Sequence, residues 1–415
     1  MQYTITPPTH INTTIDLPAS KSISNRSLII HALSGGCLKL ENLSDCDDTK
    51  VIIRALEYMP EVIDVKAAGT AMRFLTAYLS VTDGEHTITG TERMKHRPIG
   101  VLVDALRYMG ADIEYEGEEG FPPMHIKGHA LEGGHIEVPG NVSSQYISAL
   151  LIIGPVLKKG LELKLTENIV SRPYIDLTLW TMREFGAHAE WTDVDTITIQ
   201  PKPYDQKEYL IENDWSASSY WYETLALLDD KESRLRLSGL MDGSMQGDSI
   251  ARYLFSILGV KTAFRNKTPG IPTDILLTRR LRTIKHLDYD FINSPDLAQT
   301  FIAGCAGMDI PFHFTGLGSL KIKETDRIEA MKRELKKLGY MIEDKDGTEM
   351  KWTGKRCEPT MEPIDTYEDH RMAMAFAPLS IKFPGLKIND PEVVSKSYPH
   401  FWDDLKQVGF SITED

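Results

Sequence analysis

The stretch LRYMGA at residues 106–111 decides the fold, because the same phrase returns along the chain. Its other copies are MREFGA at 182–187, FSILGV at 255–260, LKKLGY at 335–340 and LKQVGF at 405–410. Their glycines lie 76, 73, 80 and 70 residues apart, and a degenerate copy, LEYMPE, begins at residue 56. A glycine directly after a helix adopts the left-handed conformation without strain, so each copy marks the end of a helix.

The six copies predict six modules of a repeated α/β design. Alternating apolar and polar residues follow the glycines, as at 111–115 and 196–200, and predict strands there. No linker rich in Gly, Ser or Pro separates two halves of the chain. The best domain boundary lies near Asp214, where a polar, proline-bearing segment at 201–213 gives way to an apolar helical run. The sequence leaves open how the modules close up.

The chain is acidic: its 415 residues carry 46 Lys and Arg against 60 Asp and Glu, a net charge of -14. An apolar content of 41% predicts a soluble globular protein with a large core, and the length suggests two or three domains. An acidic protein repels nucleic acid, and the basic residues occur in short separated groups that suit small anions better. We therefore expect small-molecule ligands and no nucleic-acid partner.

Cysteine usage and the most apolar segments indicate the compartment. The four cysteines are widely spaced and form no CxxC pair, which argues against a zinc site and a disulfide scaffold. The first residues, MQYTITPPTH, lack the pattern of a signal peptide. The nearly apolar stretch 146–157 is interrupted by Gly154-Pro155 and is too short to span a bilayer. We expect a cytoplasmic protein without a transmembrane helix.

The segment KETDR at 323–327 combines two cations with two carboxylates directly before an amphipathic helical run. Helix starts attract anions, and Lys323 and Arg327 reinforce that field. Glu324 and Asp326 are also ordinary first-turn residues that complement the helix dipole without a ligand. A second cationic helix start, PASKSISNRS at 18–27, favours the anion-binding interpretation.

Three further segments leave a structural and a functional interpretation open. GNVSSQY at 140–146 suits a phosphate at a helix start, although Ser143 is equally suited to an N-cap. The basic loop from Arg93 to Pro98 is either a solvated surface or a grip on a carboxylate or phosphate. DHR at 369–371 is either a local ion pair or part of a site. The sequence has no GxGxxG, GxxxxGK[ST], HExxH or GxSxG motif, so nucleotide, metal and acyl-serine chemistry lack support.

Nine segments in order resemble the EPSP synthase family of enolpyruvyl transferases, over almost the whole chain. They are LPASKSISNRS (17–27), AAGTAMRFL (67–75), HRPIG (96–100), GNVSSQY (140–146), SRPYIDLTL (171–179), SPDLAQT (294–300), KETDR (323–327), DHRMAMAF (369–376) and SKSYP (395–399). The resemblance implies a two-domain inside-out α/β barrel of six βαβαββ units, three per domain. It places residues 1–17 and 214–415 in a first domain, 18–213 in a second, and the active site in the cleft between them.

The resemblance also implies the reaction, with no metal and no organic cofactor. Members of the family transfer the enolpyruvyl group of phosphoenolpyruvate to the 5-hydroxyl of shikimate 3-phosphate and release phosphate through a tetrahedral intermediate. Both substrates are anions, which explains cationic clusters within an acidic chain. A monomer that closes on shikimate 3-phosphate is expected.

The implied site residues fall into three groups. Those expected at shikimate 3-phosphate are Lys21, Ser22, Arg26, Ser143, Ser144, Gln145, Ser171, Tyr174, Asp296, Ser319 and Lys323. Those expected at phosphoenolpyruvate are Lys21, Gly69, Arg97, Gln145, Arg327, Arg371 and Lys396. The chemistry needs a base for the 5-hydroxyl and an acid for the methylene carbon, and we assign Asp296 and Glu324 to these roles, with Lys21 as a possible partner.

The chain departs from the family pattern in several places. Ala67 and Ser319 each replace a usual Asn, Phe74 replaces a common Pro, and the stretch between Asp48 and Ala67 is short enough to lack a strand pair. Gly69 leaves the room characteristic of glyphosate-sensitive members. The nearest rival, UDP-N-acetylglucosamine enolpyruvyl transferase, usually has a reactive Cys in the loop equivalent to 93–98, which here has none. A catalytically dead, anion-binding protein on the same scaffold is the alternative from another class.

Overall fold

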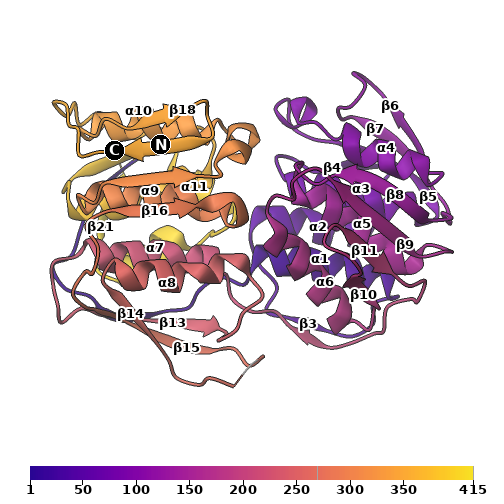
Figure 1. Ribbon diagram of the computed structural model, residues 1–415, viewed down its shortest axis with the longest axis horizontal. Helices are drawn as coiled ribbons and strands as arrows, with labels where there is room; N and C mark the ends of the chain where they lie inside the picture. The colour runs from indigo at the N-terminus through magenta and orange to yellow at the C-terminus, as the bar shows by residue number, and fades with distance from the viewer. Residues whose placement is uncertain (269, 415) are drawn as a thin grey trace. The chain divides into compact units, whose positions relative to one another are not determined.

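The computed structural model describes residues 1–268 and 270–414, and the chain divides into two compact units (Figure 1). Unit 1 comprises Met1–Pro18 and Glu212–Asp415, and unit 2 comprises Ala19–Ile211. Both ends of the chain lie in unit 1, where strands β1 (Gln2–Thr6) and β21 (Ser411–Glu414) pair. Each unit is therefore a mixed α/β body, and each has its own hydrophobic core.

The helices and strands of unit 2 alternate along the chain (Figure 1). Its helices are α1 (Lys21–Leu33), α2 (Asp47–Tyr58), α3 (Gly69–Ser80), α4 (Gly100–Tyr108), α5 (Ser144–Ile153) and α6 (Arg172–Glu184). Its strands are β3 (Leu40–Glu41), β4 (Val62–Asp64), β5 (Gly84–Thr89), β6 (Asp112–Tyr115), β7 (Met124–Gly128), β8 (Gly134–Pro139), β9 (Leu161–Thr166), β10 (Ala189–Trp191), β11 (Thr196–Ile199) and β12 (Tyr209–Leu210).

Unit 1 has the same alternation. Its helices are α7 (Trp215–Leu227), α8 (Ala251–Ile257), α9 (Ala298–Gly307), α10 (Arg327–Lys337), α11 (His370–Phe376) and α12 (Phe401–Gln407). Besides β1 and β21, its strands are β2 (Asn12–Ile15), β13 (Arg234–Leu240), β14 (Val260–Phe264), β15 (Thr273–Arg279), β16 (Leu287–Asp290), β17 (Phe312–Thr315), β18 (Glu343–Lys345), β19 (Glu349–Trp352) and β20 (Leu386–Asn389).

Four sheets share one strand order, in which the first two strands in the chain are parallel neighbours and the fourth lies between the second and the third. These sheets are β4-β5-β7-β6, β8-β9-β11-β10, β2-β13-β15-β14 and β16-β17-β19-β18. In three of the four sheets one α-helix connects the parallel pair, as α5 does between β8 and β9, whereas the whole of unit 2 and α7 lie between β2 and β13. The repeat seen in the sequence therefore extends to the order in which the strands pair in the sheets.

The repeated glycines end helices as the sequence predicts. Gly110, Gly186, Gly259, Gly339 and Gly409 have φ between +79° and +106°, a conformation that L side chains rarely adopt. In the degenerate copy Met59 takes the left-handed C-cap position of α2. Only β4 lies between α2 and α3, and β3 pairs with β12 alone in a two-stranded sheet. The short stretch between Asp48 and Ala67 therefore lacks a strand pair, as expected.

One central helix organises each core. Every residue of α7 except Ser216 is buried, including Trp215, Tyr220 and Trp221, and α5 is buried at nine of its positions. A helix that is apolar on all sides is enclosed by its neighbours. Its N-terminal residues are then held by packing, which makes a helix start a rigid place for ligand-binding side chains. Within the described residues, no helix is both long and apolar enough to cross a membrane.

Candidate active site

The helix starts of unit 2 gather the predicted binding residues of that unit. Arg26 near the start of α1 donates to the carbonyl oxygen of Tyr174 in the first turn of α6, at 3.2 Å. Arg73 of α3 donates to the Gln145 side chain in the first turn of α5, at 3.1 Å. These bonds join α1 to the first turn of α6 and α3 to the first turn of α5, and a helix start favours anions.

Lys21 begins α1, after Ser20 accepts the N–H of Ile23 as the helix N-cap. Its ammonium lies 3.2 Å from Asp48, which is the second residue of α2 and is buried. The Lys21 side chain is 17% exposed, so it stays open to a ligand from one side. Asp48 fixes the position of this cation, and the prediction did not include it.

Arg26 is almost fully buried and donates only to neutral oxygens. Its guanidinium bonds Thr178 at 2.7 Å, the Ser22 carbonyl at 2.9 Å and Ser148 at 3.2 Å, besides Tyr174. Burial lowers the pKa of Arg26 to about 10. Most of its N–H donors bond to groups within the unit. Its expected contact with the shikimate carboxylate stays a prediction.

Gly69 lies beneath two arginines at the start of α3. A Cβ at Gly69 would come within 2.7 Å of Nη1 and Nη2 of Arg97 and of Nη1 of Arg73. Arg73 is buried, donates to the Gly69 carbonyl at 2.8 Å and positions Gln145. Of the basic loop at 93–98, Arg97 is thus the side chain placed over the helix start, whereas Lys95 pairs with Glu92 at 2.6 Å.

The predicted hydroxyl groups of unit 2 also sit at helix starts. Ser143 is the N-cap of α5 and accepts the N–H of Gln145 at 3.4 Å, while Ser144 is buried as the first helical residue. Ser171 precedes α6 with φ +55°, a strained conformation for a residue with a side chain, and its carbonyl accepts the N–H of Tyr174. The N-cap interpretation of Ser143 is confirmed, and it leaves its hydroxyl hydrogen available as a donor.

In unit 1 the Arg327 guanidinium joins three carboxylates. It lies 2.6 Å from Asp369, 2.9 Å from Glu324 and 3.1 Å from Asp296, and its side chain is 2% exposed. These carboxylates come from segments before α9, α10 and α11, so Arg327 ties three helix starts together. Burial opposes the charge of Arg327, but the three carboxylates outweigh it and raise its pKa above the ordinary value.

Asp296 meets three cations. Arg371 lies 3.0 Å away, Arg327 at 3.1 Å and Lys323 at 3.9 Å. Burial opposes ionisation of Asp296, but Arg371, Lys323 and Arg327 outweigh it and hold its pKa well below the ordinary value. The pKa of Lys323 is lowered, first by burial and then by the charge of Arg327. Asp296 is therefore a carboxylate in this state, with its charge fully compensated.

Glu324 bridges two cations that come from different segments. Its carboxylate oxygens lie 2.9 Å from Arg327 and 3.2 Å from Lys396. Lys396 ends the short 3-10 helix Pro391–Lys396, and its side chain is 13% exposed. Ser319 lies half-buried in the segment Gly318–Ile322, which precedes Lys323. The structure thus brings Asp296, Lys323, Glu324, Arg327, Arg371 and Lys396 into one cluster.

Of the two interpretations left open for DHR at 369–371, the geometry favours part of a site, because the side chains of Asp369 and Arg371 have different ion-pair partners. Asp369 caps α11 by accepting the N–H of Arg371 at 2.9 Å, but its ion pair is with Arg327. Arg371 instead reaches Asp296 and the hydroxyl of Tyr220. An ion pair between residues 42 positions apart is a tertiary contact, and nothing in DHR alone indicates it.

Asp248 is a further acidic group beside this cluster that the sequence analysis missed. It is buried and accepts a hydrogen bond from Ser216 at the start of α7. Burial and then the charge of Asp296 raise its pKa to about 7. Because Asp248 titrates near neutrality, the net charge around the candidate catalytic residues depends on pH.

One family model and several curated proteins match almost the whole chain. The EPSP synthase (3-phosphoshikimate 1-carboxyvinyltransferase) family model matches residues 5–63 and 57–405. A 3-phosphoshikimate 1-carboxyvinyltransferase of Bacteroides fragilis (strain YCH46) is 57% identical over 413 residues, 99% of each chain. One of Photobacterium profundum is 33% identical over 433 residues, 98% of each.

Solved structures show the same fold. An EPSP synthase from Acinetobacter baumannii superposes with a TM-score of 0.79 over 100% of both chains, at 21% identity. The enolpyruvyl transferase NikO from Streptomyces tendae gives a TM-score of 0.73 over 99% of this chain and 98% of its own, at 16% identity. With the family model and the two close relatives, these similarities lead to one conclusion: this chain belongs to the EPSP synthase (3-phosphoshikimate 1-carboxyvinyltransferase) family.

Proposed function

We propose that this chain transfers the enolpyruvyl group of phosphoenolpyruvate to the 5-hydroxyl of shikimate 3-phosphate, in the shikimate pathway toward chorismate and the aromatic amino acids. The observation that carries the proposal is Asp296 held between Arg371 and Arg327, at 3.0 and 3.1 Å. A carboxylate so placed is ionised and can accept a proton once the substrates take up its cations, and those cations suit anionic substrates. The relative that is 57% identical is named 3-phosphoshikimate 1-carboxyvinyltransferase, and this name supports the choice of substrates.

The cationic clusters of the two units act on one pair of substrates in this proposal. Shikimate 3-phosphate binds at the helix starts of unit 2 and contacts Lys323. Phosphoenolpyruvate contacts Arg97, Arg327, Arg371 and Lys396. Each cluster has several fixed cations, which offset the repulsion between two anions brought together. The implied cleft between the units and its closure on shikimate 3-phosphate belong to the proposal, as does the six-unit inside-out barrel.

Substrate binding prepares the acid and the base. Glu324 pairs with Arg327 and Lys396, and Asp296 is held in its charged form by Arg371, Lys323 and Arg327. Phosphoenolpyruvate that takes these cations as its own partners leaves both carboxylates less compensated, which favours proton uptake. Glu324 can then protonate the methylene carbon while Asp296 accepts the proton of the 5-hydroxyl.

The remaining steps balance the transfer. The 5-hydroxyl oxygen attacks the carbon that protonation has made electrophilic, and a tetrahedral intermediate forms. Phosphate leaves with the proton that Asp296 took from the 5-hydroxyl, while a proton returns from the methyl group to Glu324, which gives the enol ether product and restores both carboxyl groups. Lys21, fixed by Asp48, compensates charge on the phosphate. We further propose a monomer in the cytoplasm, in keeping with four cysteines that are all free.

Phosphate release from phosphoenolpyruvate tests the proposal. The protein is incubated with phosphoenolpyruvate and either shikimate 3-phosphate or UDP-N-acetylglucosamine. We expect phosphate release and an enol ether product with shikimate 3-phosphate alone. Release only with UDP-N-acetylglucosamine would replace the acceptor, and release with neither would favour an anion-binding protein without catalysis.

A further inference from the structure

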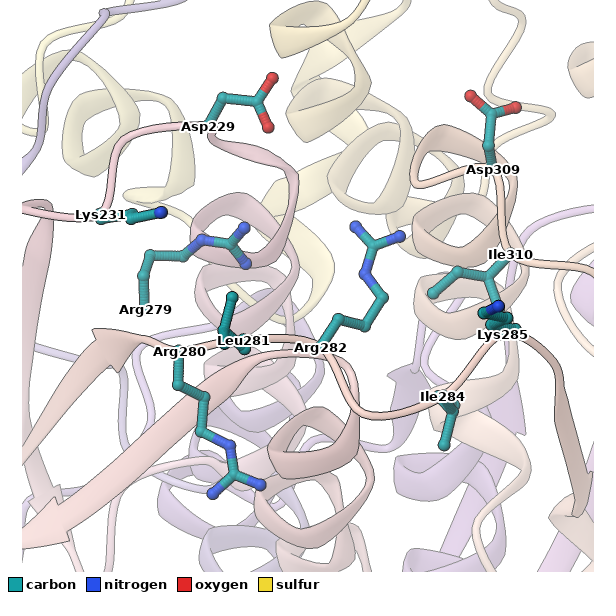
Figure 2. Close-up of a pocket in the computed structure, with 10 residues that line it drawn as sticks. All are labelled: Asp229, Lys231, Arg279, Arg280, Leu281, Arg282, Ile284, Lys285, Asp309 and Ile310. Carbon is teal, nitrogen blue, oxygen red and sulfur yellow. The ribbon is translucent and has the colours of Figure 1, made fainter.

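A second cationic region in unit 1 lies apart from the candidate active site. A pocket of about 740 Å³ is formed where α7, α8 and α9 end (Figure 2). Asp229 follows α7, Asp309 and Ile310 follow α9, and Arg279 to Lys285 connect β15 to β16. Asp296 precedes the other end of α9, a helix of ten residues and therefore about 15 Å long. The two regions are at opposite ends of the same helix.

The pocket carries an excess of positive charge. Five cations line it: Lys231, Arg279, Arg280, Arg282 and Lys285. Within residues 1–268 and 270–414, none of the five forms an ion pair.

Each of the two carboxylates that line the pocket also has a cationic partner outside it. Asp229 lies 3.7 Å from Lys382, and Asp309 pairs with Arg356. Neither of these partner cations lines the pocket. Two carboxylates against five cations leave the pocket with an excess of positive charge, in a protein whose net charge is -14.

Arg279 and Arg282 form the centre of this charge. Arg279 donates weakly to the Gly259 carbonyl at 3.5 Å, and its buried Nε has no hydrogen-bond partner among the described residues. Arg282 donates to the Met308 carbonyl at 2.9 Å. Burial and then the nearby charge of Arg282 lower the pKa of Arg279. Figure 2 shows both guanidinium groups on the side of the connection that faces Asp229, with the Lys231 ammonium beside Arg279.

Helix ends alone do not account for these cations. Gly259 follows α8 and Met308 follows α9, so each arginine places one donor on the carbonyl end of a helix. A helix end carries about half a negative charge, and three ends cannot neutralise five cations. The buried Nε–H of Arg279, which has no partner among the described residues, can also donate to a bound anion.

The size and lining of the pocket indicate the class of ligand that it binds. Its volume falls within the range of about 300–1,000 Å³ for small-molecule sites. Leu281, which is 80% exposed, supplies an apolar surface beside the guanidinium groups. We propose that this pocket binds a phosphorylated small molecule of nucleotide size, with phosphate oxygens between Arg279 and Arg282 and an apolar ring against Leu281. Planar guanidinium groups suit phosphate because they donate two parallel hydrogen bonds.

Binding of N-methylanthraniloyl ATP, measured by fluorescence anisotropy at 150 mM salt, tests the proposal. We expect saturable binding to the full chain that shikimate 3-phosphate does not displace. The double variant Arg279→Gln, Arg282→Gln should weaken binding at least tenfold. Arg265→Gln is the matched control, because Arg265 is exposed in the same unit and lies outside the pocket. Lys231→Gln, at an exposed position, should weaken binding severalfold and serves if the double variant does not fold.

Several outcomes would overturn the proposal. They are an absence of saturable binding, an equal loss in Arg265→Gln, and displacement by shikimate 3-phosphate, which would place the probe in the candidate active site. Adenosine binding as tightly as the triphosphate would also contradict it, because the cations would then contribute nothing. The experiment does not depend on catalysis, so its failure leaves the proposed transferase function intact.

Discussion

Arg327 donates its Nε–H to Asp369 at 2.6 Å, and the two side chains are 2% and 0% exposed. A charge buried this deeply is stable only with its partner, because removal of one partner leaves the other uncompensated. The same arginine holds Asp296 and Glu324, so this pair fixes the position of the proposed base and acid together. The arrangement of the acidic groups in unit 1 depends on it.

Asp369→Asn should destabilise the protein and reduce turnover. Asn keeps the N-cap of α11, so the change removes the charge and spares the cap. We expect a loss of about 3 kcal/mol in the free energy of unfolding, measured by urea denaturation. Asp326→Asn is the matched control, because Asp326 caps α10 from an exposed position. An equal effect of both substitutions would show that the pair with Arg327 contributes nothing specific.

Asp296→Asn should lower kcat by about 100-fold or more, because the amide cannot accept the 5-hydroxyl proton. It also removes the negative charge that Arg371, Arg327 and Lys323 share. Substrate binding should weaken less than turnover, since the cations remain. Asp288→Asn, at a 70% exposed position on β16, is the control. Near-normal kcat in Asp296→Asn would remove Asp296 from the chemistry.

Gly69→Ala should raise the KM for phosphoenolpyruvate at least tenfold. The new methyl group would lie 2.7 Å from the guanidinium nitrogens of Arg97 and Arg73, so both must move. The KM for shikimate 3-phosphate should change much less. Gly100→Ala tests the effect of a methyl group alone, because Gly100 also begins a helix and its methyl group would meet only Gly120, at 3.5 Å. Similar KM values in both variants would contradict the placement of Arg97 over Gly69.

Asp248 should make the stability depend on pH. Its pKa is raised to about 7 by burial and the charge of Asp296, whereas an aspartate in the unfolded chain titrates near pH 4. Between these values the folded state keeps a proton that the unfolded state has lost, so the contribution of Asp248 to stability falls as pH rises from about 4 to about 7. Asp248→Asn removes this loss.

The difference in the free energy of unfolding between Asp248→Asn and the wild type should therefore grow in favour of the variant from pH 5 to pH 8. Two pKa units lie between pH 5 and the raised pKa, so the difference should grow by at most about 3 kcal/mol over this range. Urea denaturation of both proteins across this range measures it. A difference that is constant with pH would mean that Asp248 does not titrate there.

The sequence predicts the local features and misses the tertiary ones, for a physical reason. Gly110, Gly186 and Gly259 end helices because a backbone conformation demands glycine, and this requirement is visible in a few neighbouring residues. The cationic helix starts at Lys21 and Arg327 are equally local, since a charge and an apolar run lie side by side in the chain.

The partners of these cations are not local. Asp48 lies 27 residues from Lys21, and Asp369 lies 42 residues from Arg327, so neither pairing follows from a motif. In the sequence, Arg73 only follows a turn of small residues. In the structure, its buried guanidinium donates to the Gly69 carbonyl and to Gln145, which lies 72 residues away in the chain. Asp248 gains its raised pKa from burial, which the acidic composition of the chain does not reveal.

The central claim is that cations of both units serve one reaction, and two lysine variants test it most directly. Lys21→Met in unit 2 and Lys323→Met in unit 1 are compared by phosphate release from phosphoenolpyruvate and shikimate 3-phosphate, beside the exposed controls Lys39→Met and Lys345→Met. We predict that kcat/KM falls by about 100-fold or more in each of the first two and stays within about threefold in the controls. Normal kcat/KM in either Lys21→Met or Lys323→Met would contradict a site shared by both units.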